Sequence, residues 1–598
     1  MCGIVGIINS DNLKIKAINV LSKLEYRGYD SAGVSFLAKN NIKTITEVGK
    51  ISQLSKSLTS TAYNAFDSVI GHTRWATHGI VSKNNAHPFS NQKISLVCNG
   101  IIENYSELKL KYLKNYKKNI ESDTETIFLV LNELSKKIKD HDKLIQKLVS
   151  IIKGHYAFLI YFSDTQEIFS LKSGSPLSVG KNADGIYFSS DSSALTEYVN
   201  NIYHLQDGDI IKVSLNTISH LNGKKIIFEN QAKVVNEFSK GDFKHFMIKE
   251  IHEQPHVIKK TQKYYDADYF LDFRNKLKDL TNNLDSFVFV GCGTAYHACL
   301  VAKYYFEQFT DIDVSCEYAS ELRYKNISTK KNSIYVFISQ SGETMDTLMA
   351  LKYVKSKDYT TIVVTNSLES TMVREANITL PTFAMKEIGV ASTKAFTCQL
   401  LALANLCIEI GNIRKNISKK EYIQLKQDLK NIPTKITKIL KNSSYIDKVV
   451  SLLSSSKACY FIARNIVFPI ALEGSLKLKE ISYMHSEGFA GGEMKHGPIA
   501  LIDKNVLSIC LNPKNKLYEK SSSNCEEILA RGGKVVVFSS KKSSSKKNLL
   551  QIIMPKENYI DTPFIYTIPL QLISYYFALN EGTDIDQPRN LAKSVTVE

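Results

Sequence analysis

The sequence predicts a multidomain chain in which a mostly antiparallel α+β domain precedes two tandem α/β units with parallel sheets. Three observations carry this prediction. Short β-type runs punctuated by Gly, Asn, Asp and Ser fill the first third of the chain. From about residue 284, apolar strands alternate with helical stretches. That alternating series then recurs once at a nearly constant offset.

The bulk composition is that of a folded globular protein. The 598 residues are enough for several domains of about 100–200 residues each. Hydrophobic residues make up 43% and charged residues 23%, which excludes a disordered chain. Apolar stretches are interrupted before the roughly 18 residues that a membrane span needs, and no secretory signal is visible at the N-terminus. We therefore expect a cytoplasmic protein that does not enter a membrane.

Cysteine spacing and charge exclude two further classes. The ten cysteines include no C-x-x-C pair and no Cys/His cluster with zinc-finger spacing, so we expect a reducing compartment and no metal. The net charge of +17 comes from lysines spread along the chain, without an aromatic-interleaved basic motif. We expect no nucleic-acid partner, although a basic protein can attract anionic metabolites.

In the first third, the β-type runs predict strands and one stretch predicts a helix. The helix is expected around 122–139, where "SDTE" opens a longer helical pattern. The strands are expected at 2–8, 68–75, 94–100, 156–162, 185–191 and 208–214.

The later part of the chain contains one α/β unit twice. Tyr460 lies 173 residues after Phe287, and Val535 lies 173 residues after Ile362. A shared offset of this kind is much better explained by duplication than by chance recurrence of apolar runs. The paired strands are expected at 286–294, 333–344 and 360–367, and again at 457–465, 505–515 and 533–540.

These patterns set the predicted domain boundaries. The N-terminal domain is expected at 1–217 and a charged linker at 218–280. The two α/β units follow at 281–420 and 447–588, and a C-terminal tail occupies 589–598.

The opening "MCGIVGI" places a cysteine directly before a strand. Cys2 can be a small hydrophobic residue at a permissive position. Alternatively, removal of Met1 would join a thiol and a free α-amine on one residue. With a pKa of about 7.7–8.0, that amine can act as the base for its own side chain.

Other residues of the first third suit an amide-hydrolysing thiol. The Asn99 side chain and the Gly100 N–H can stabilise an oxyanion. Arg74 can hold a carboxylate bidentately, and Asp123 can hold an ammonium group. Together they describe a site for glutamine, although Asn-Gly is a common turn, Asp123 could cap a helix and Arg74 could form a surface ion pair.

Two motifs in the repeats suit a sugar phosphate. "SQSGET" closes a strand and opens a helix, so its three hydroxyls, on Ser339, Ser341 and Thr344, favour a phosphate site over simple capping. In "EGSLKLKE", Glu473, Lys477 and Glu480 share one helix face. A salt-bridged, solvent-exposed face is the alternative interpretation of that spacing.

The N-terminal motifs resemble those of class II, N-terminal nucleophile glutamine amidotransferases. They are "MCGIVGI", "LEYRGYDSAGV", "GHTRWATHG", "NAHP", "CNGIIENY" and "SDTE". With the two repeats, the chain resembles the glucosamine-6-phosphate synthase family over essentially its whole length. The resemblance implies an αββα sandwich with Cys2 as the nucleophile, Asn99 and Gly100 as the oxyanion hole, and Trp75 as the gate of an ammonia passage. It places Arg74, Thr77, His87 and Asp123, with Trp75 beside them, around glutamine.

The same resemblance implies that the repeats are sugar isomerase (SIS) domains. It implies that Glu480 moves a proton between C1 and C2 of the sugar, that His496 assists ring opening and that Lys593 forms a Schiff base at C2. The sugar phosphate would be bound by Ser339, Gln340, Ser341, Thr344, Ser392 and Lys477.

The family implies conversion of fructose 6-phosphate and glutamine to glucosamine 6-phosphate and glutamate, as the first committed step of amino-sugar synthesis. It implies a homodimer, no metal and no cofactor. Two positions depart from the family pattern: Cys98 replaces a frequent His, and Ala295 replaces a Ser of the "CGTS" turn. The alternatives are a phosphoribosyl amidotransferase, which should carry a pyrophosphate-binding acidic strand end, and a sugar-phosphate-sensing regulator, which would not need Cys2 or Lys593.

Overall fold

The chain forms two compact units in the computed structural model. Unit 1 comprises Met1–Phe238 with Ala592–Glu598, and unit 2 comprises Ser239–Leu591. The residues that the structure describes are 2–58, 66–114, 116–117, 119–214, 217–230, 239–267, 270–281, 284–327 and 332–596. The C-terminal segment is thus grouped with the first unit although it follows the second in the sequence.

Unit 1 contains two antiparallel sheets. The larger has the order β14-β11-β9-β10-β1-β4-β2-β3 and the smaller has the order β13-β12-β8-β7-β6-β5. The larger sheet comprises β1 (Gly3–Ile8), β2 (Ser31–Ala38), β3 (Asn41–Val48), β4 (Ser68–Arg74), β9 (Ser178–Asn182), β10 (Gly185–Ser189), β11 (Asn201–His204) and β14 (Glu229–Asn230). The smaller comprises β5 (Phe89–Ser90), β6 (Ile94–Ile102), β7 (Gly154–Phe162), β8 (Glu167–Ser173), β12 (Ile210–Ser214) and β13 (Thr217–His220).

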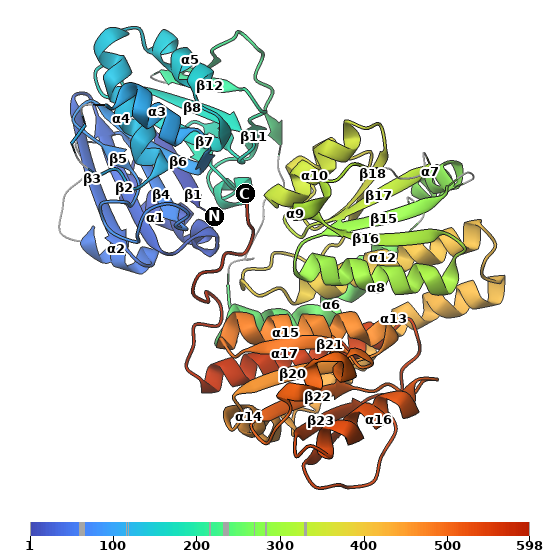
Figure 1. Ribbon diagram of the computed structural model, residues 1–598. Coiled ribbons are helices and arrows are strands. Elements are labelled where there is room, and N and C mark those ends of the chain that lie inside the picture. Colours follow the sequence, from blue (N-terminus) through green and yellow to red (C-terminus); the bar gives the residue numbers. More distant parts are fainter. Residues whose placement is uncertain are drawn as a thin grey trace. The chain divides into compact units, whose positions relative to one another are not determined.

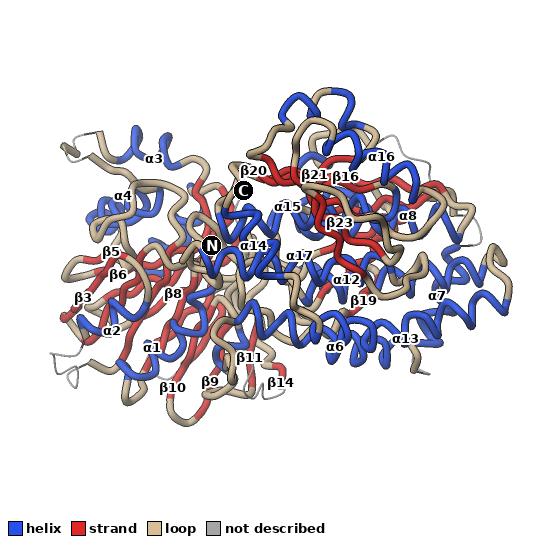
Figure 2. Tube along the Cα trace, turned by 90° about the horizontal axis from the view of Figure 1, so that it is seen from below, coloured by secondary structure: helices blue, strands red, loops and turns tan. Residues whose placement is uncertain are grey.

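Helices cover the outer faces of these sheets (Figures 1 and 2). Val5 and Ile7 of β1 pack with the α1 and α2 helices, whereas Ile4 and Ile8 pack into the core between the sheets. The strand is apolar throughout because both of its faces are buried. The helices of unit 1 are α1 (Leu13–Leu24), α2 (Ile51–Ser57), α3 (Tyr105–Tyr112), α4 (Asp123–Lys137) and α5 (His141–Ile151). The result is the expected αββα arrangement.

Unit 2 contains two parallel five-stranded sheets of matching order. One runs β16-β15-β17-β18-β19 and the other runs β21-β20-β22-β23-β24. The first comprises β15 (Ser286–Gly291), β16 (Asp313–Tyr318), β17 (Ser333–Ile338), β18 (Thr360–Thr365) and β19 (Ile378–Pro381). The second comprises β20 (Ala458–Ala463), β21 (Ser486–Ala490), β22 (Val506–Leu511), β23 (Lys534–Ser539) and β24 (Leu549–Ile553). All six predicted repeat strands are present, and the duplication is confirmed.

A continuous helical core joins the two sheets of unit 2. Residues of α8, α12, α15 and α17 contribute to one hydrophobic cluster that also takes in residues of both sheets, and Figure 1 shows these helices between the sheets. Smaller clusters on the outer faces contain residues of α10 and of α16. These helices are α8 (Thr294–Phe309), α10 (Met345–Lys355), α12 (Lys394–Ile413), α15 (Phe468–Ser482), α16 (Tyr518–Leu529) and α17 (Thr562–Asn580).

The stretch 218–280, predicted as a linker, contains two helices of unit 2. They are α6 (Phe246–Tyr265) and α7 (Phe270–Thr281). Helix α6 buries Met247, Ile251 and Val257 in the core of that unit. Its charged residues occur between these apolar positions, so the overall composition conceals an amphipathic helix.

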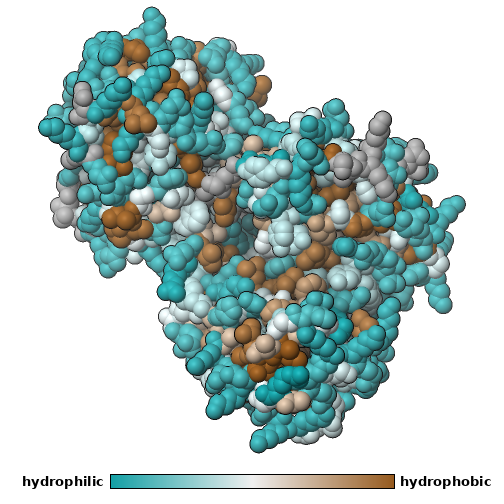
Figure 3. Space-filling view, in the orientation of Figure 1, coloured by the Kyte–Doolittle hydropathy of each residue, from teal (hydrophilic) through white to brown (hydrophobic). Residues whose placement is uncertain are grey.

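Helix α12 meets the length and hydropathy of a membrane span. It is the one such helix among the residues that the structure describes, and 89% of its apolar window is buried inside the protein. A helix that is hydrophobic all round is expected in the core of a large protein. On the face drawn in Figure 3, hydrophilic side chains cover most of the surface and hydrophobic ones form separate groups.

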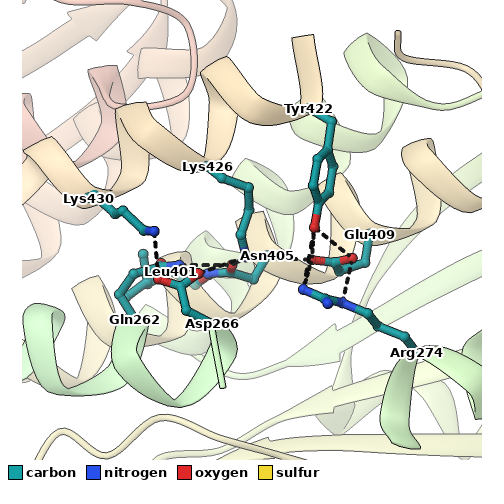
Figure 4. A network of polar contacts seen from close by, with 9 residues as sticks. All are labelled: Gln262, Asp266, Arg274, Leu401, Asn405, Glu409, Tyr422, Lys426 and Lys430. Carbon is teal, nitrogen blue, oxygen red and sulfur yellow. Dashed lines mark hydrogen bonds and ion pairs between the residues drawn. The ribbon is translucent and has the colours of Figure 1, made fainter. Parts of the chain in front are cut away.

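A buried polar network connects α12 to α7 and to α13 (Lys419–Lys441) (Figure 4). Glu409 of α12, whose side chain is 1% exposed, forms an ion pair of 3.0 Å with Arg274 Nε and accepts a hydrogen bond of 3.1 Å from Tyr422. Lys426 Nζ donates to Asn405 Oδ1 at 2.6 Å and lies 3.5 Å from Glu409 Oε1. Glu409 therefore carries the negative charge shared by two cations.

Replacing Glu409 by glutamine should destabilise unit 2 strongly. Removing one partner of a buried ion pair leaves the other charge uncompensated, at a cost of about 3–5 kcal/mol in the free energy of unfolding. Chemical denaturation measures this change. The matched control is Lys430→Gln, because Lys430 is half-exposed in its ion pair with Asp266, and its loss should cost less than about 1 kcal/mol. Equal effects of the two variants would contradict the prediction.

Candidate active sites

Pairing of β1 with β4 brings Cys2 beside Trp75. Gly3 pairs with Thr73, so the residues that adjoin these strand ends are neighbours. The Trp75 backbone N–H donates to Cys2 Sγ at 3.4 Å. A side chain at Gly3 would collide with Leu24 and Thr73, since an added Cβ would lie 2.7 Å from each. The small residue after Cys2 thus allows this close packing.

Burial raises the pKa of the Cys2 thiol, although the Trp75 backbone hydrogen bond and the Arg74 guanidinium act in the opposite direction. A thiol with a raised pKa is mostly protonated near neutral pH. A base must therefore take its proton before it can attack a carbonyl carbon. Met1, whose removal would free the α-amine of Cys2, lies outside the described residues.

Asn99 and Gly100 lie on β6 next to this thiol. Asn99 Nδ2 donates to the Cys2 carbonyl oxygen at 2.9 Å. Gly100 has φ +111°, and an added Cβ would lie 1.9 Å from the His155 carbonyl oxygen on β7. Only glycine fits that position. The structure brings together the three residues that the sequence groups as nucleophile and oxyanion donors.

Arg74 and Asp123 are buried near Cys2, with 4% exposure each. The charges of Cys2, Asp30 and Asp123 all act on the Arg74 guanidinium, so a surface ion pair is excluded for Arg74. Asp123 accepts hydrogen bonds from the backbone N–H groups of Ile102, at 2.9 Å, and Thr124. The side-chain cap of α4 is Ser122, whose Oγ accepts from the Glu125 N–H at 3.1 Å, so Asp123 is not the helix cap.

His87 and Thr77 differ in their surroundings. His87 is buried, and its ring centroid lies 4.2 Å from that of His72. Burial lowers the pKa of His72 to about 3, and it lowers the pKa of His87 well below its usual value. Both imidazoles are neutral at physiological pH. Thr77 is exposed, and its hydroxyl lies 3.3 Å from His78 Nδ1.

Sequence reasoning assigned no role to Asp30, which belongs to the same cluster. Its carboxylate accepts from the Ala76 N–H at 2.8 Å and thereby holds the segment that carries Trp75 and Thr77. Its charge also acts on Cys2 and Arg74. The motif "LEYRGYDSAGV" contained this residue, but the carboxylate has no nearby partner in the sequence that would point to a role.

The "SQSGET" segment forms a tight turn between β17 and α10. Ser339 Oγ accepts from the Gly342 N–H at 3.1 Å and lies 2.9 Å from the Thr344 hydroxyl. Ser341 Oγ accepts from the Glu343 N–H at 3.1 Å. The Gln340 carbonyl accepts from the Asn366 N–H. Hydroxyls and the free N–H groups of the α10 N-terminus are therefore gathered in one turn, as an anion site requires.

Lys477 and Glu480 form a close ion pair on α15. Lys477 Nζ lies 2.6 Å from Glu480 Oε2, and the Lys477 side chain is only 1% exposed. Burial lowers the pKa of Lys477, but the charges of Glu480 and Glu473 outweigh that effect and raise the pKa to about 12. Glu473 is also buried. This face of α15 is therefore not a solvent-exposed salt-bridged face.

Ser392, His496 and Lys593 lie in three different settings. Ser392 Oγ donates to Glu387 Oε2 at 3.1 Å, just before α12. His496 is exposed at the end of a short 3₁₀ helix, Glu493–His496. Lys593 belongs to the segment grouped with unit 1, where its backbone N lies 3.5 Å from the Tyr26 carbonyl oxygen. The structure does not gather Lys593 with Glu480 in one unit.

Three comparisons place the chain among known proteins. A glutamine amidotransferase domain model matches residues 72–197, and a SIS domain model matches 282–408 and 452–581. Proteins named glutamine–fructose-6-phosphate aminotransferase [isomerizing], from Bradyrhizobium diazoefficiens, Mesorhizobium japonicum and Francisella tularensis, are 40% identical to this chain, and each match covers 100% of both chains. The chain belongs to the isomerizing glutamine–fructose-6-phosphate aminotransferase family.

Solved structures agree with this aminotransferase assignment for unit 2. The C-terminal domain of the Francisella tularensis glucosamine-fructose-6-phosphate aminotransferase is 39% identical, with a TM-score of 0.56, and covers 58% of this chain and 99% of its own. A tagatose-6-phosphate ketose/aldose isomerase from Escherichia coli shares 15% identity, with a TM-score of 0.51, over 58% of this chain and 95% of its own. That second likeness concerns the fold alone.

Two positions at which this aminotransferase departs from the family pattern have clear surroundings. Cys98 is buried, and its Sγ lies 3.4 Å from the Asn99 carbonyl oxygen, so a thiol occupies the frequent histidine position. Beside Ala295, the Thr294 hydroxyl donates to Glu473 at 3.0 Å and accepts from Lys477 at 3.1 Å. The Thr294 hydroxyl is thus engaged with α15.

Proposed function

We propose that this chain converts fructose 6-phosphate and glutamine into glucosamine 6-phosphate and glutamate. The observation that carries the proposal is the pairing, in one chain of this family, of a buried thiol site at Cys2 with a buried Lys477–Glu480 ion pair. One assay tests it: glutamate and hexosamine phosphate should form in equal amounts from the two substrates. Formation of glutamate without the amino sugar in the presence of fructose 6-phosphate would contradict it.

Glutamine hydrolysis begins at Cys2. After removal of Met1, the α-amine takes the thiol proton and Sγ attacks the side-chain amide carbon of glutamine. Asn99 Nδ2 and the Gly100 N–H stabilise the resulting oxyanion. The amide nitrogen leaves as ammonia, and water then releases glutamate from the thioester.

Four side chains hold the glutamine that Cys2 attacks. Arg74 binds the α-carboxylate and Asp123 the α-ammonium, because each presents the opposite charge in a buried site. Thr77 and His87 complete the pocket. His87 is neutral, so it contributes a hydrogen bond rather than a charge. Trp75, held at Cys2, controls the departure of ammonia.

Fructose 6-phosphate binds in the SIS repeats. The phosphate lies against Ser339, Gln340, Ser341 and Thr344 at the α10 N-terminus. His496 assists opening of the sugar ring, and Lys593 forms a Schiff base at C2 with loss of water. Ammonia replaces Lys593 at C2. Glu480 then takes a proton from C1 and delivers it to C2, while Lys477 and Ser392 line the pocket.

Removing a hydroxyl from the phosphate turn should weaken fructose 6-phosphate binding. Ser341→Ala or Thr344→Ala deletes one hydrogen bond to a charged group, a loss of about 1.5–3 kcal/mol, which is roughly ten- to a hundredfold in Kd. Calorimetry with each substrate separately measures the change. Ser356→Ala, an exposed serine at the end of the same helix, is the control and should bind normally. An equal loss of glutamine affinity would indicate a folding defect instead.

We further propose a cytoplasmic homodimer that takes part in amino-sugar synthesis. Two features support the location: the ten cysteines are free, and 89% of the apolar window of α12 is buried. Sedimentation of the purified chain tests the oligomeric state, and a monomer at micromolar concentration would contradict the dimer.

A further inference from the structure

A relay of polar contacts links α8 of the first repeat to α15 of the second. His297 Nδ1 lies 2.7 Å from Glu473 Oε2. The other Glu473 oxygen accepts from the Thr294 hydroxyl at 3.0 Å, and that hydroxyl accepts from Lys477 Nζ at 3.1 Å. Lys477 in turn pairs with Glu480. His297 is thus the outermost member of a chain of contacts that ends at the carboxylate assigned to proton transfer.

The two carboxylates compete for Lys477 on unequal terms. Lys477 Nζ lies 2.6 Å from Glu480 Oε2 but 3.5 Å from Glu473 Oε1. Both glutamates are on the same helix face, and Glu473 is the more deeply buried, with side-chain exposure of 2% against 20%. In low dielectric surroundings the buried carboxylate should attract the ammonium more strongly. The unequal distances therefore need an explanation.

His297 supplies that explanation. An ionised carboxylate only accepts hydrogen bonds, so Nδ1 of His297 is the donor to Glu473. With Thr294 bonded to its second oxygen, Glu473 has both oxygens satisfied without a close contact to Lys477. The ammonium group is left to pair closely with Glu480.

We propose that His297 is a positioning residue for the isomerisation: by satisfying Glu473, it directs Lys477 to Glu480. This inference rests on the proposed function and adds a residue to it. The charged or titratable groups facing Lys477 among the described residues are Glu473 and Glu480 on its own helix and Glu387 from the segment before α12. His297 faces Glu473 from α8.

The consequence is a dependence of the isomerisation on pH. A cation beside a carboxylate favours its ionised form, and a carboxylate must be ionised to take a proton from C1. Without the His297 hydrogen bond, Glu473 draws Lys477 away from Glu480. The catalytic carboxylate then needs a higher pH to ionise, and the acidic limb of the pH–rate profile moves upward.

Two substitutions separate hydrogen bonding from mere packing. His297→Leu keeps the bulk and removes the donor. His297→Asn keeps a donor, because Nδ2 of asparagine, like Nδ1 of histidine, is bonded to Cγ. The measurement is exchange of the C1 hydrogen of fructose 6-phosphate in deuterated water, followed from pH 5 to 9, with glutamate release in the same preparation as a check of folding.

We expect the acidic limb of His297→Leu to move up by about one pH unit, as loss of a nearby opposite charge implies. Exchange on that limb should fall about tenfold and recover at high pH, and His297→Asn should follow the wild type. A uniform loss at every pH in His297→Leu would overturn the proposal, as would an Asn variant that behaves like the Leu variant. Wild-type protein that neither exchanges C1 hydrogen nor forms product would instead refute the proposed function.

Discussion

Cys2→Ala should eliminate glutamine hydrolysis and leave fructose 6-phosphate binding intact. The substitution removes the only thiol in hydrogen-bond contact with the Trp75 N–H among the described residues. Removal of the nucleophile from a hydrolase that acts through a covalent intermediate lowers kcat by about 10⁴–10⁶-fold. Binding of fructose 6-phosphate should be unchanged because the Ser339–Thr344 turn belongs to unit 2. Glutamate release and calorimetry measure the two effects.

Cys98→Ala is the matched control for this experiment. It removes a second buried thiol close to the same site, where Cys98 Sγ contacts the Asn99 carbonyl oxygen at 3.4 Å. Because Cys98 supplies no oxyanion donor, glutamate release should stay within about tenfold of the wild type, equivalent to less than about 1.4 kcal/mol in the barrier. A Cys2→Ala protein that still released glutamate at the wild-type rate would make Cys2 a structural residue.

The strands predicted from the sequence share one property: their apolar residues are continuous because both faces are buried. This holds for β1 and for β15, both of which are central in their sheets. Strand β2 is equally central, but its sequence SAGVSFLA contains small residues with low β-propensity. Its conformation depends on pairing with β3 and β4, which are far from it in pattern if not in sequence. Such a strand is specified by its neighbours rather than by its own residues.

The candidate sites show the same division. Glu473, Lys477 and Glu480 could be placed on one helix face because they are local in sequence. The partner of Glu473, His297, lies 176 residues away, and no pattern within α8 indicates that its imidazole meets a carboxylate. Likewise, the depth at which Arg74 is buried follows from the packing of unit 1 as a whole, not from "GHTRWATHG". Contacts between elements are what the sequence patterns leave undetermined.

Glu480→Gln should abolish the isomerisation while glutamine hydrolysis continues. The proton that leaves C1 and returns at C2 needs one group that alternates between base and acid. Glutamine keeps the shape of the side chain but cannot accept that proton, so product formation should fall about 10²–10⁴-fold. Glutamate release should persist, because Cys2 and its neighbours belong to the other compact unit.

Exchange of the C1 hydrogen in deuterated water identifies the step that Glu480 performs. In the Glu480→Gln protein this exchange should fall with product formation, because both require removal of the C1 proton. Glu487→Gln is the control: Glu487 lies on β21, close to α15 in sequence, and its side chain is 44% exposed. That variant should exchange normally. If the Glu480→Gln protein exchanged as fast as the wild type, a different group in the pocket would have to be the base, and the Lys477–Glu480 pair would serve to hold α15 rather than to move a proton.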